Sequence, residues 1–512
     1  MSAHSEQLAS SQLLYLFVLW LIPLALTIFL IKRLFANSVS HRNSPPSPSK
    51  LPIIGHLHKL GLYPHRSLQK LAQRHGPLML LRLGSVPTLI VSSAEAAQEA
   101  LKTHDLAFAD RPRSKLNEKL LYKYKDVSSA PYGEYWRQMK SICVIQLLSN
   151  KRVYDMRRVR ENETALLVKK IAESSPSVVD LSDLLMAYTN DVVSMSAFGQ
   201  KFSEGESGRQ LRRLMKEFVS VLGGFDIGTY IPRLAWFSSL LGIYNKADAV
   251  AKEFDEFLER IVDEHVDTTK RERAEGAEDF VDVLLEIYKD KSITGYSIDR
   301  ESIKAIVLDV LAAGTDTTYT VLEWAMTELL RHPQVMAKLQ NELRSTGRKR
   351  SDIIVPDEYE KIPYLEAVIK ETLRVHPPVP LLVPREARND VNIMGYEIVA
   401  KTMVIVNAWA IGRDPTLWDE PDEFRPERFL NSSVDIRGHD FQLIPFGVGR
   451  RSCPGISFAM VTNEIALANL LHKFNWELPN GMKRGDLDMT ETTGSTIHKK
   501  EPLLAIATPY SV

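Results

Sequence analysis

The part of the sequence best suited to metal chemistry is a turn that carries one cysteine among glycines and arginines. Cys453 lies in the segment Phe446-Gly447-Val448-Gly449-Arg450-Arg451-Ser452-Cys453-Pro454-Gly455. Glycines let the backbone adopt positive φ and come close to a bound group. Nearby cations, and backbone amides directed at the sulfur, favour its thiolate form. The segment predicts a metal site with a single thiolate ligand; the alternative is a tight turn that holds an inert core cysteine.

A second group of chemically capable residues lies in the middle of an apolar segment, residues 302–331, that we expect to be helical. It reads Ala313-Gly314-Thr315-Asp316-Thr317-Thr318. Glycine inside a helix costs about 1 kcal/mol relative to alanine, and threonine hydroxyls can bond carbonyls one turn back. An acid and a hydroxyl in a groove beside the metal can deliver protons to dioxygen. The alternative is a polar stripe on a surface helix, but the apolar flanks favour burial.

Charged residues form the third pattern. Glu371 and Arg374 are three residues apart in a segment expected to be helical, so they share one face. Taken alone such a pair means little, because an exposed ion pair contributes about 0–1 kcal/mol. A later arginine, Arg428, occurs in Pro426-Glu427-Arg428-Phe429.

The composition limits the classes of protein that this chain can belong to. The 512 residues are 44% hydrophobic and 25% charged with a formal net charge of zero, so nothing favours nucleic acid as a partner. The two cysteines, Cys143 and Cys453, exclude a disulfide-rich scaffold and suit a reducing compartment. Cys143 lies in an apolar helical context and is interpreted as a core residue. A disulfide between the two would occupy the proposed metal ligand.

Helical patterns dominate the chain and must position these residues. The sequence predicts a mainly α protein with a small β-rich subdomain. We expect strands at 78–83, 88–91, 391–398, 403–407 and near the C-terminus. We expect helices at 94–102, 134–148, 153–174, 181–198, 208–222, 247–273, 279–289, 302–331, 333–344, 357–362, 364–375 and 456–474. The aromatic stretch 222–237 either dips into a bilayer surface or roofs a pocket, or it is a buried interhelical loop.

The N-terminal region has the pattern of a membrane anchor. Residues 13–31 contain no charged side chain, and a helix of that length would span roughly 28 Å. Lys32 and Arg33 follow, so the body should lie on the cytosolic side. We expect a short lumenal leader (1–12), a transmembrane anchor (13–31), a basic, proline-rich hinge (32–55) and a catalytic domain (56–512). A cleaved signal peptide is the alternative.

The pattern F-x-x-G-x-R-x-C-x-G is matched by Phe446, Gly449, Arg451, Cys453 and Gly455, and it resembles the haem-thiolate loop of the cytochromes P450. The resemblance implies the P450 fold and haem b with Cys453 as the iron ligand. It implies that Asp316 is the acid of a proton relay, that Thr317 is the hydroxyl beside the reacting oxygen, and that Glu371, Arg374 and Arg428 form a structural triad.

The resemblance also implies which residues contact the cofactor and the substrate. Residues expected at the haem and its propionates are Trp136, Lys140, Arg385, Phe446, Arg451 and Gly455. Arginine is usual at the position of Lys140, and lysine loses the bidentate geometry. The segments expected on the substrate side are 114–124, 307–315, 379–383 and 494–497, and the individual residues named within them are Ala313, Thr315, Leu381, Leu382, Val383, Ser495 and Thr496. His376 is interpreted as a hydrogen-bonded residue at a helix exit, because a second protein ligand would block oxygen.

Two further segments, Ala313 to Tyr319 and Glu501-Pro502-Leu503, are similar to those of the plant A-type microsomal group. That implies a single-pass protein of the endoplasmic reticulum membrane that inserts one oxygen atom into a small lipophilic plant specialised metabolite: a terpenoid, alkaloid, phenylpropanoid, coumarin or oxime. Electrons would come from NADPH through a separate P450 reductase, with cytochrome b5 as an optional second donor, because no dinucleotide fingerprint is present. The alternatives are a haem-thiolate isomerase or dehydratase that needs no reductase, and a non-catalytic haem-binding sensor.

Overall fold

The computed structural model describes residues 20–28, 43–202, 205–267, 278–346, 353–359 and 362–510. The expected leader lies outside these residues, and the expected anchor is described only at 20–28, which are helical and exposed. Part of the expected hinge packs on the body. The Pro46 carbonyl accepts a bond from the Leu80 amide at 3.0 Å, and the Pro48 carbonyl lies 2.9 Å from His56 Nε2.

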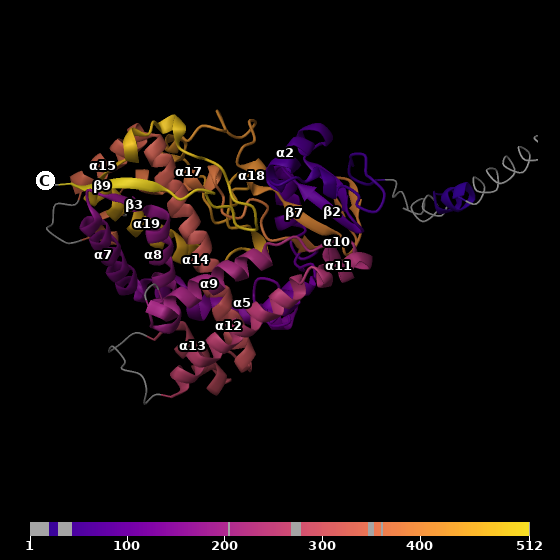
Figure 1. The fold of residues 1–512 in the computed structure, drawn as a ribbon, viewed down its shortest axis with the longest axis horizontal. Coiled ribbons are helices and arrows are strands. Elements are labelled where there is room, and N and C mark those ends of the chain that lie inside the picture. The colour runs from indigo at the N-terminus through magenta and orange to yellow at the C-terminus, as the bar shows by residue number, and fades with distance from the viewer. Residues whose placement is uncertain are drawn as a thin grey trace, which may run out of the picture.

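Helices make up most of the body (Figure 1). Their bounds are α2 Pro64–His75, α3 Ala94–Gln98, α4 Lys115–Leu120, α5 Glu134–Ser141, α6 Asn150–Asp155, α7 Arg157–Ser174, α8 Leu181–Phe198, α9 Gly205–Leu222, α10 Ile227–Tyr230, α11 Ala235–Leu240, α12 Ile243–Val266, α13 Phe280–Lys289, α14 Arg300–Arg331, α15 Pro333–Thr346, α16 Pro356–Tyr359, α17 Pro363–Val375, α18 Ala408–Ile411 and α19 Ile456–Lys473.

Small sheets complete the described fold. The strands are β1 Leu78–Leu83, β2 Val86–Val91, β3 Val178–Asp180, β4 Arg385–Glu386, β5 Val391–Ile393, β6 Tyr396–Ile398, β7 Met403–Val406, β8 Phe474–Glu477 and β9 Leu504–Pro509. They form a sheet of order β1-β2-β7-β4, a sheet of order β3-β9-β8 and the hairpin β5-β6. Figure 1 shows β2 and β7 at one end of the body and β3 and β9 at the other. The expected mainly α fold with a small β portion is confirmed.

Helix α14 forms the centre of the core and packs against α8, α17 and α19. Gly314 favours this packing, because a Cβ built on it would lie 3.3 Å from Val193 Cγ2 of α8, and Val193 would have to move by a few tenths of an ångström. The glycine therefore permits a close approach of two helices. Among the described helices, α14 is the one long and apolar enough to cross a membrane, yet most of its apolar stretch is buried inside the protein. It is a core helix.

The expected elements are largely correct, and local signals explain the departures. Helix α8 has the predicted bounds, because the Asp180 side chain accepts the Asp183 amide at one end and Gly199 has φ 66° at the other. The expected helix 134–148 changes into a π-helical turn at Ile142–Leu147, and the expected helix 153–174 is divided between α6 and α7. Met394 and Gly395, both with positive φ, turn the expected strand 391–398 into a hairpin.

The aromatic stretch 222–237 is not a buried interhelical loop. It contains α10 and the start of α11, and its apolar side chains reach the surface: Phe225 is 59% exposed and Trp236 61% exposed. Leu240 and Leu241, which follow, are also exposed. The α10 end packs on the β1–β2 turn, because the Tyr230 carbonyl accepts the Ser85 amide at 2.8 Å. The two interpretations that remain are that this stretch dips into a bilayer surface or that it roofs a pocket.

Candidate functional site

The cysteine loop holds Cys453 just before the N-terminus of α19. The Cys453 amide donates to the Phe446 carbonyl at 3.0 Å, which closes the loop, and the Gly455 amide donates to Cys453 Sγ at 3.3 Å. Gly449 has φ 70°, and a Cβ there would lie 2.5 Å from the Leu101 carbonyl oxygen. Only glycine allows this approach. Cys453 and Cys143 are both free, and Cys143 is buried in the core.

A lysine acts electrostatically on the sulfur. Arg450 pairs with Asp105 at 3.1 Å, and Arg451 donates to backbone carbonyls; the expectation that these arginines place charge near the sulfur stays a prediction. Lys140 of α5 donates to the Ser452 carbonyl and interacts electrostatically with Cys453. Cys453 keeps accessible surface, yet the surrounding protein is close enough that burial raises the pKa of its thiol. The Gly455 amide and Lys140 oppose this shift without reversing it.

Arg385 offers a buried donor. It lies on β4, which pairs with β7, and its Nη2 donates to the Val448 carbonyl at 2.6 Å. Its Nη1 is buried and has no hydrogen-bond partner among the described residues; the nearest carboxylate, Asp105, is 3.8 Å away. Burial lowers the pKa of Arg385 to about 10. A buried guanidinium with an unused N–H fits a carboxylate ligand.

Trp136 and Arg451, two other expected cofactor contacts, already use backbone acceptors. The Trp136 indole donates to the Val127 carbonyl at 3.0 Å. Arg451 donates through Nε to Ala109 and through Nη2 to Ala130, and it lies over the Trp136 ring at 4.1 Å. Arg451 keeps further N–H groups, whereas the single indole N–H of Trp136 is used.

The donor set as a whole fits a haem. A free thiol lies in a loop that glycines bring close to neighbouring backbone, and a buried arginine has an unused donor. Haem needs one axial thiolate and donors for two propionates. Arg111, which sequence reasoning missed, adds a third buried guanidinium beside Arg385 and Arg451, and their mutual repulsion helps lower its pKa after burial itself.

Helix α14 turns its functional side chains in two directions. Thr317 Oγ1 donates to the Ala313 carbonyl at 2.7 Å, the bond expected from the sequence, and Ala313 is exposed. Asp316 points elsewhere: its Oδ1 lies 3.1 Å from His498 Nε2. Thr318 is buried, and the buried Thr315 hydroxyl has no partner among the described residues. The pairing of Asp316 with His498 could not be found from sequence spacing.

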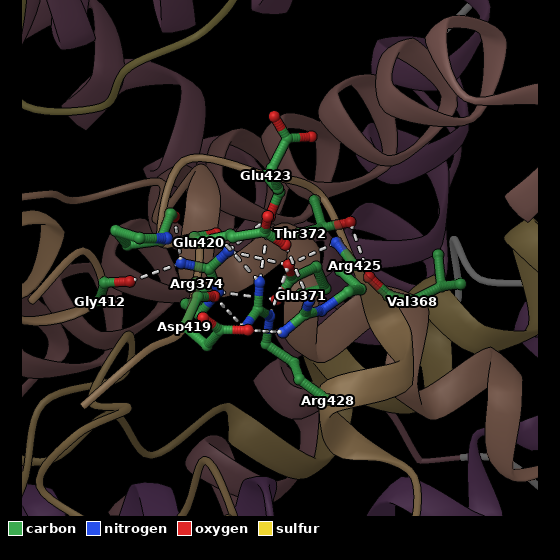
Figure 2. A network of polar contacts seen from close by, with 11 residues as sticks. Val368, Glu371, Thr372, Arg374, Gly412, Asp419, Glu420, Glu423, Arg425 and Arg428 are labelled. Atoms are coloured by element: carbon green, nitrogen blue, oxygen red, sulfur yellow. Dashed lines mark hydrogen bonds and ion pairs between the residues drawn. The ribbon is translucent and has the colours of Figure 1, made fainter. Parts of the chain in front are cut away.

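Glu371, Arg374 and Arg428 lie together, as the resemblance implies (Figure 2). Arg374 donates to the Glu371 carboxylate through Nε at 2.7 Å and Nη2 at 2.8 Å, and Arg428 donates through Nε at 3.0 Å. The remaining Arg374 N–H groups donate to the carbonyls of Gly412, Pro421 and Glu423, so all five are used. The side chains of Glu371 and Arg374 are 0% exposed. A buried ion pair with every donor satisfied holds two chain segments in one arrangement.

The residues expected at the substrate lie on three different segments. Val383 is 48% exposed, and Leu381 and Leu382 are half-buried. Leu382 lies beside the cysteine loop, since a Cβ on Gly447 would lie 3.9 Å from its Cδ1. Ser495 is exposed, Thr496 is buried, and the Ile497 amide ties this turn to the Pro378 carbonyl at 2.9 Å. Gly223 approaches Ser495, which brings the end of α9 to the same turn.

A groove of about 820 Å³ between α4 and α12 has different chemistry. Four lysines and four carboxylates line it, including Lys119 and Asp248, which form an ion pair at 2.6 Å. Six residues of the expected segment 114–124 line this groove, whereas none of the seven individual residues expected at the substrate does. Its charge does not suit a lipophilic molecule.

Comparison with known proteins identifies the family. The sequence profile of the family "Cytochrome P450" matches residues 45–506. "Cytochrome P450 736A117" of Prunus mume is 59% identical over 469 residues, 91% of this chain and 90% of that protein. "Tabersonine/lochnericine 19-hydroxylase" of Catharanthus roseus is 48% identical over 97% of this chain and 98% of that protein.

A second named enzyme and a solved structure also match this chain. "Norfluorocurarine oxidase" of a Strychnos species is 49% identical over 94% of this chain and 96% of that protein. A zebrafish cytochrome P450 solved with abiraterone is 25% identical, with a TM-score of 0.74 over 88% of this chain and 100% of that chain. The chain therefore belongs to the cytochrome P450 family, as a plant A-type haem-thiolate monooxygenase.

Proposed function

We propose that this enzyme inserts one atom of dioxygen into a small lipophilic plant specialised metabolite: a terpenoid, alkaloid, phenylpropanoid, coumarin or oxime. Two relatives that match nearly the whole chain are named as an oxidase of norfluorocurarine and a hydroxylase of tabersonine and lochnericine. Apolar side chains at Leu381, Leu382 and Val383, of which Leu382 lies beside the cysteine loop, suit an apolar substrate. The observation that carries the proposal is the free Cys453 thiol in a loop whose Val448 carbonyl accepts from the buried Arg385, while Arg385 Nη1 makes no hydrogen bond to any described residue.

The chain's residues have separate tasks in this mechanism. Haem, when bound, supplies oxygen activation, and a thiolate ligand favours O–O cleavage. Cys453 would be the iron ligand, and Arg385 would hold a propionate with its unused N–H. Arg451, Lys140 and Trp136 complete the proposed wall of the haem site, with Phe446 and Gly455 shaping the loop. Thr317 holds a hydroxyl, and Asp316 holds the proton that the hydroxyl passes on.

Electrons would come from NADPH through a separate P450 reductase, with cytochrome b5 as an optional second donor; use of a redox partner is general in the family. Arg450, next to the cysteine loop, has a side chain that is 49% exposed and pairs with Asp105. We infer that it meets an acidic face of the reductase. Arg450→Glu should weaken reductase-driven turnover most at low salt, where charges are least screened. Equal turnover at every salt concentration would remove Arg450 from the interface.

The decisive experiment for the activity class uses the purified enzyme in lipid with metabolite libraries, analysed by mass spectrometry. Product that needs NADPH, reductase and dioxygen together supports the monooxygenase. Product without reductase indicates the isomerase or dehydratase alternative, and haem binding without any product indicates the sensor. Spectral shifts on addition of each compound would narrow the library first.

The apolar surface at α10 and α11 supports a membrane location beyond the single-pass anchor proposed for residues 13–31. Trp236, Leu240 and Leu241 are exposed there, and Leu51 and Ile53 are exposed near the β1–β2 turn that contacts Tyr230. We infer that this face rests on the endoplasmic reticulum membrane with the catalytic domain in the cytosol. Brominated lipids should quench the fluorescence of Trp236, measured as the difference between the parent and Trp236→Phe. Unchanged quenching in the variant would place this face away from lipid.

A further inference from the structure

The carboxylate of Asp316 and the imidazole of His498 form a contact between α14 and a turn near the C-terminus. His498 Nε2 lies 3.1 Å from Asp316 Oδ1. The turn holds the histidine in place, because the His498 amide donates to Thr492 Oγ1 at 3.0 Å and the Thr492 amide donates to the His498 carbonyl at 2.9 Å. The histidine side chain is 17% exposed, so it lies between the helix and solvent.

The hydrogen bonds around His498 require one proton between His498 Nε2 and Asp316 Oδ1. Thr320 Oγ1 donates to the Asp316 carbonyl at 2.7 Å and lies 2.7 Å from His498 Nδ1. Because a hydroxyl has a single hydrogen, Nδ1 must then donate to Thr320. Nε2 faces a carboxylate oxygen, so either Nε2 or Oδ1 carries a proton. If the Thr320 hydroxyl instead rotates to donate to Nδ1, the neutral ring carries its hydrogen on Nε2. One proton then again lies between Nε2 and Asp316 Oδ1.

Among the other groups around His498, one carboxylate favours its protonated form. Glu323, one turn beyond Thr320 on α14, acts on it electrostatically, and the Tyr319 ring lies 5.4 Å from its ring. Tyr319 is neutral, and its hydroxyl donates to Glu323 at 2.6 Å. Lys499, the next residue, directs its ammonium to the Asp488 carbonyl. Burial alone lowers the pKa of His498, but the bond to Asp316 and the two carboxylates raise it above 6.5 overall.

We propose that His498 is a positioning residue that holds Asp316 through this contact and returns the proton that Asp316 gives up. This rests on the proposed role of Asp316 as the relay acid. Thr317 lies about 100° further around the helix than Asp316, so the acid must leave His498, or pass its proton along, to serve that hydroxyl. The shared proton moves from His498 Nε2 to Asp316 Oδ1, Asp316 passes it on, and solvent water then supplies a new proton to Nε2. No electrons are transferred in these steps.

A titration of His498 tests its pairing with Asp316 without measuring catalytic activity. Histidine labelled at Cε1 can be followed by NMR in the diamagnetic reduced carbon monoxide complex, and the signal missing from His498→Gln is that of His498. Its pKa should lie above 6.5 in the parent and fall by about 1 unit or more in Asp316→Asn, which removes the opposite charge. His439→Gln, at an exposed histidine, should not affect that signal. Equal pKa values in the parent and Asp316→Asn would overturn the pairing.

Peroxide release tests the role in turnover. With NADPH, reductase and dioxygen, His498→Gln should release several-fold more of its electrons as hydrogen peroxide, and this fraction should lose the parent's dependence on pH. A purely structural role would not remove that pH dependence. Asp316→Asn should also raise the peroxide fraction, and His439→Gln should match the parent.

The outcomes distinguish the role of His498 from the role of Asp316. A rise in Asp316→Asn with no change in His498→Gln overturns the role of His498 and leaves that of Asp316. No rise in either variant overturns both. A rise in His498→Gln alone shows that the histidine acts without Asp316 and also overturns the proposal. If His498→Gln retains no haem, the titration in Asp316→Asn, with His498→Asn for assignment, decides the matter.

Discussion

Glu371 and Arg428 are 57 residues apart in the sequence, and Arg428 Nε lies 3.0 Å from Glu371 Oε1. The same oxygen accepts the Arg425 amide at 2.7 Å. One buried carboxylate therefore ties α17 to the segment that precedes the cysteine loop (Figure 2).

Glu371→Gln keeps the shape of the side chain and leaves Arg374 buried without its counter-charge. Loss of one partner of a buried pair costs about 3–5 kcal/mol. We expect the variant to be recovered with little or no haem, measured as haem absorbance per mole of folded protein. Glu366→Gln on the same helix is the matched control, because that carboxylate is 56% exposed and pairs with Lys370. Normal haem content in Glu371→Gln would show that the triad does not secure the core.

Arg385→Leu removes the buried guanidinium whose Nη1 makes no hydrogen bond within the described part of the chain, and Arg385→Lys keeps the charge without the fork. Because bidentate contacts to carboxylates require arginine, we expect both variants to lose haem faster than the parent, leucine more than lysine. The rate of haem transfer to an apo-globin acceptor measures this. Arg388→Lys, at an exposed arginine nearby, should leave the rate unchanged. Identical rates in all variants would exclude Arg385 as a propionate contact.

Thr317→Ala removes the proposed relay hydroxyl and its bond to Ala313. We expect product formation with NADPH to fall about 10- to 100-fold while NADPH consumption continues and peroxide accumulates. Thr317→Ser should restore coupling, because it restores the hydroxyl. Thr327→Ala, which removes the same kind of bond from Thr327 to the Glu323 carbonyl on the same helix, is the control. Full coupling in Thr317→Ala would favour a reaction without a proton relay.

Glu328 controls stability in acid. It is buried between His376, 2.7 Å away, and His332, 3.2 Å away, and their bonds lower the pKa of the carboxyl from 4.5 to about 2 in spite of its burial. A depressed folded-state pKa stabilises the protein above the unfolded value and ceases to do so as the pH falls toward 2.

Glu328→Gln should therefore remove about 3 kcal/mol at neutral pH and flatten the loss of stability between pH 4.5 and 2. Unfolding midpoints across this range test it, with Glu501→Gln at an exposed carboxylate as control. If the stability of Glu328→Gln falls as steeply as that of the parent between pH 4.5 and 2, Glu328 is not the cause of the acid sensitivity.

Local signals in the sequence were sufficient for most elements. The cap at Asp180 and the glycine at position 199 define α8, and the turn around Cys453 carries its own pattern of glycines. What the sequence does not contain is the partner of each side chain. Asp316 pairs with His498, and Trp136 donates to Val127, across distances in the chain that no periodicity encodes.

Arg111 was missed for the same reason. Its sequence context, Ala109-Asp110-Arg111-Pro112, reads as an ordinary charged loop. Its burial beside two further arginines follows from the approach of the Val383 carbonyl, to which it donates at 2.5 Å. The electrostatic effect of Lys140 on Cys453 was also missed, because α5 is far from the cysteine loop in the sequence. The directions of Arg450 and Arg451 depend on Asp105 and on carbonyls of residues 109–130.

The most direct test of the account is the spectrum of the reduced protein with carbon monoxide. We predict that the parent and Cys143→Ser show the red-shifted Soret band of thiolate-ligated haem, and that Cys453→His loses that band while circular dichroism shows a folded protein. A folded parent that binds no haem, or a Cys453→His variant with the parent's spectrum, would contradict ligation of the iron by Cys453.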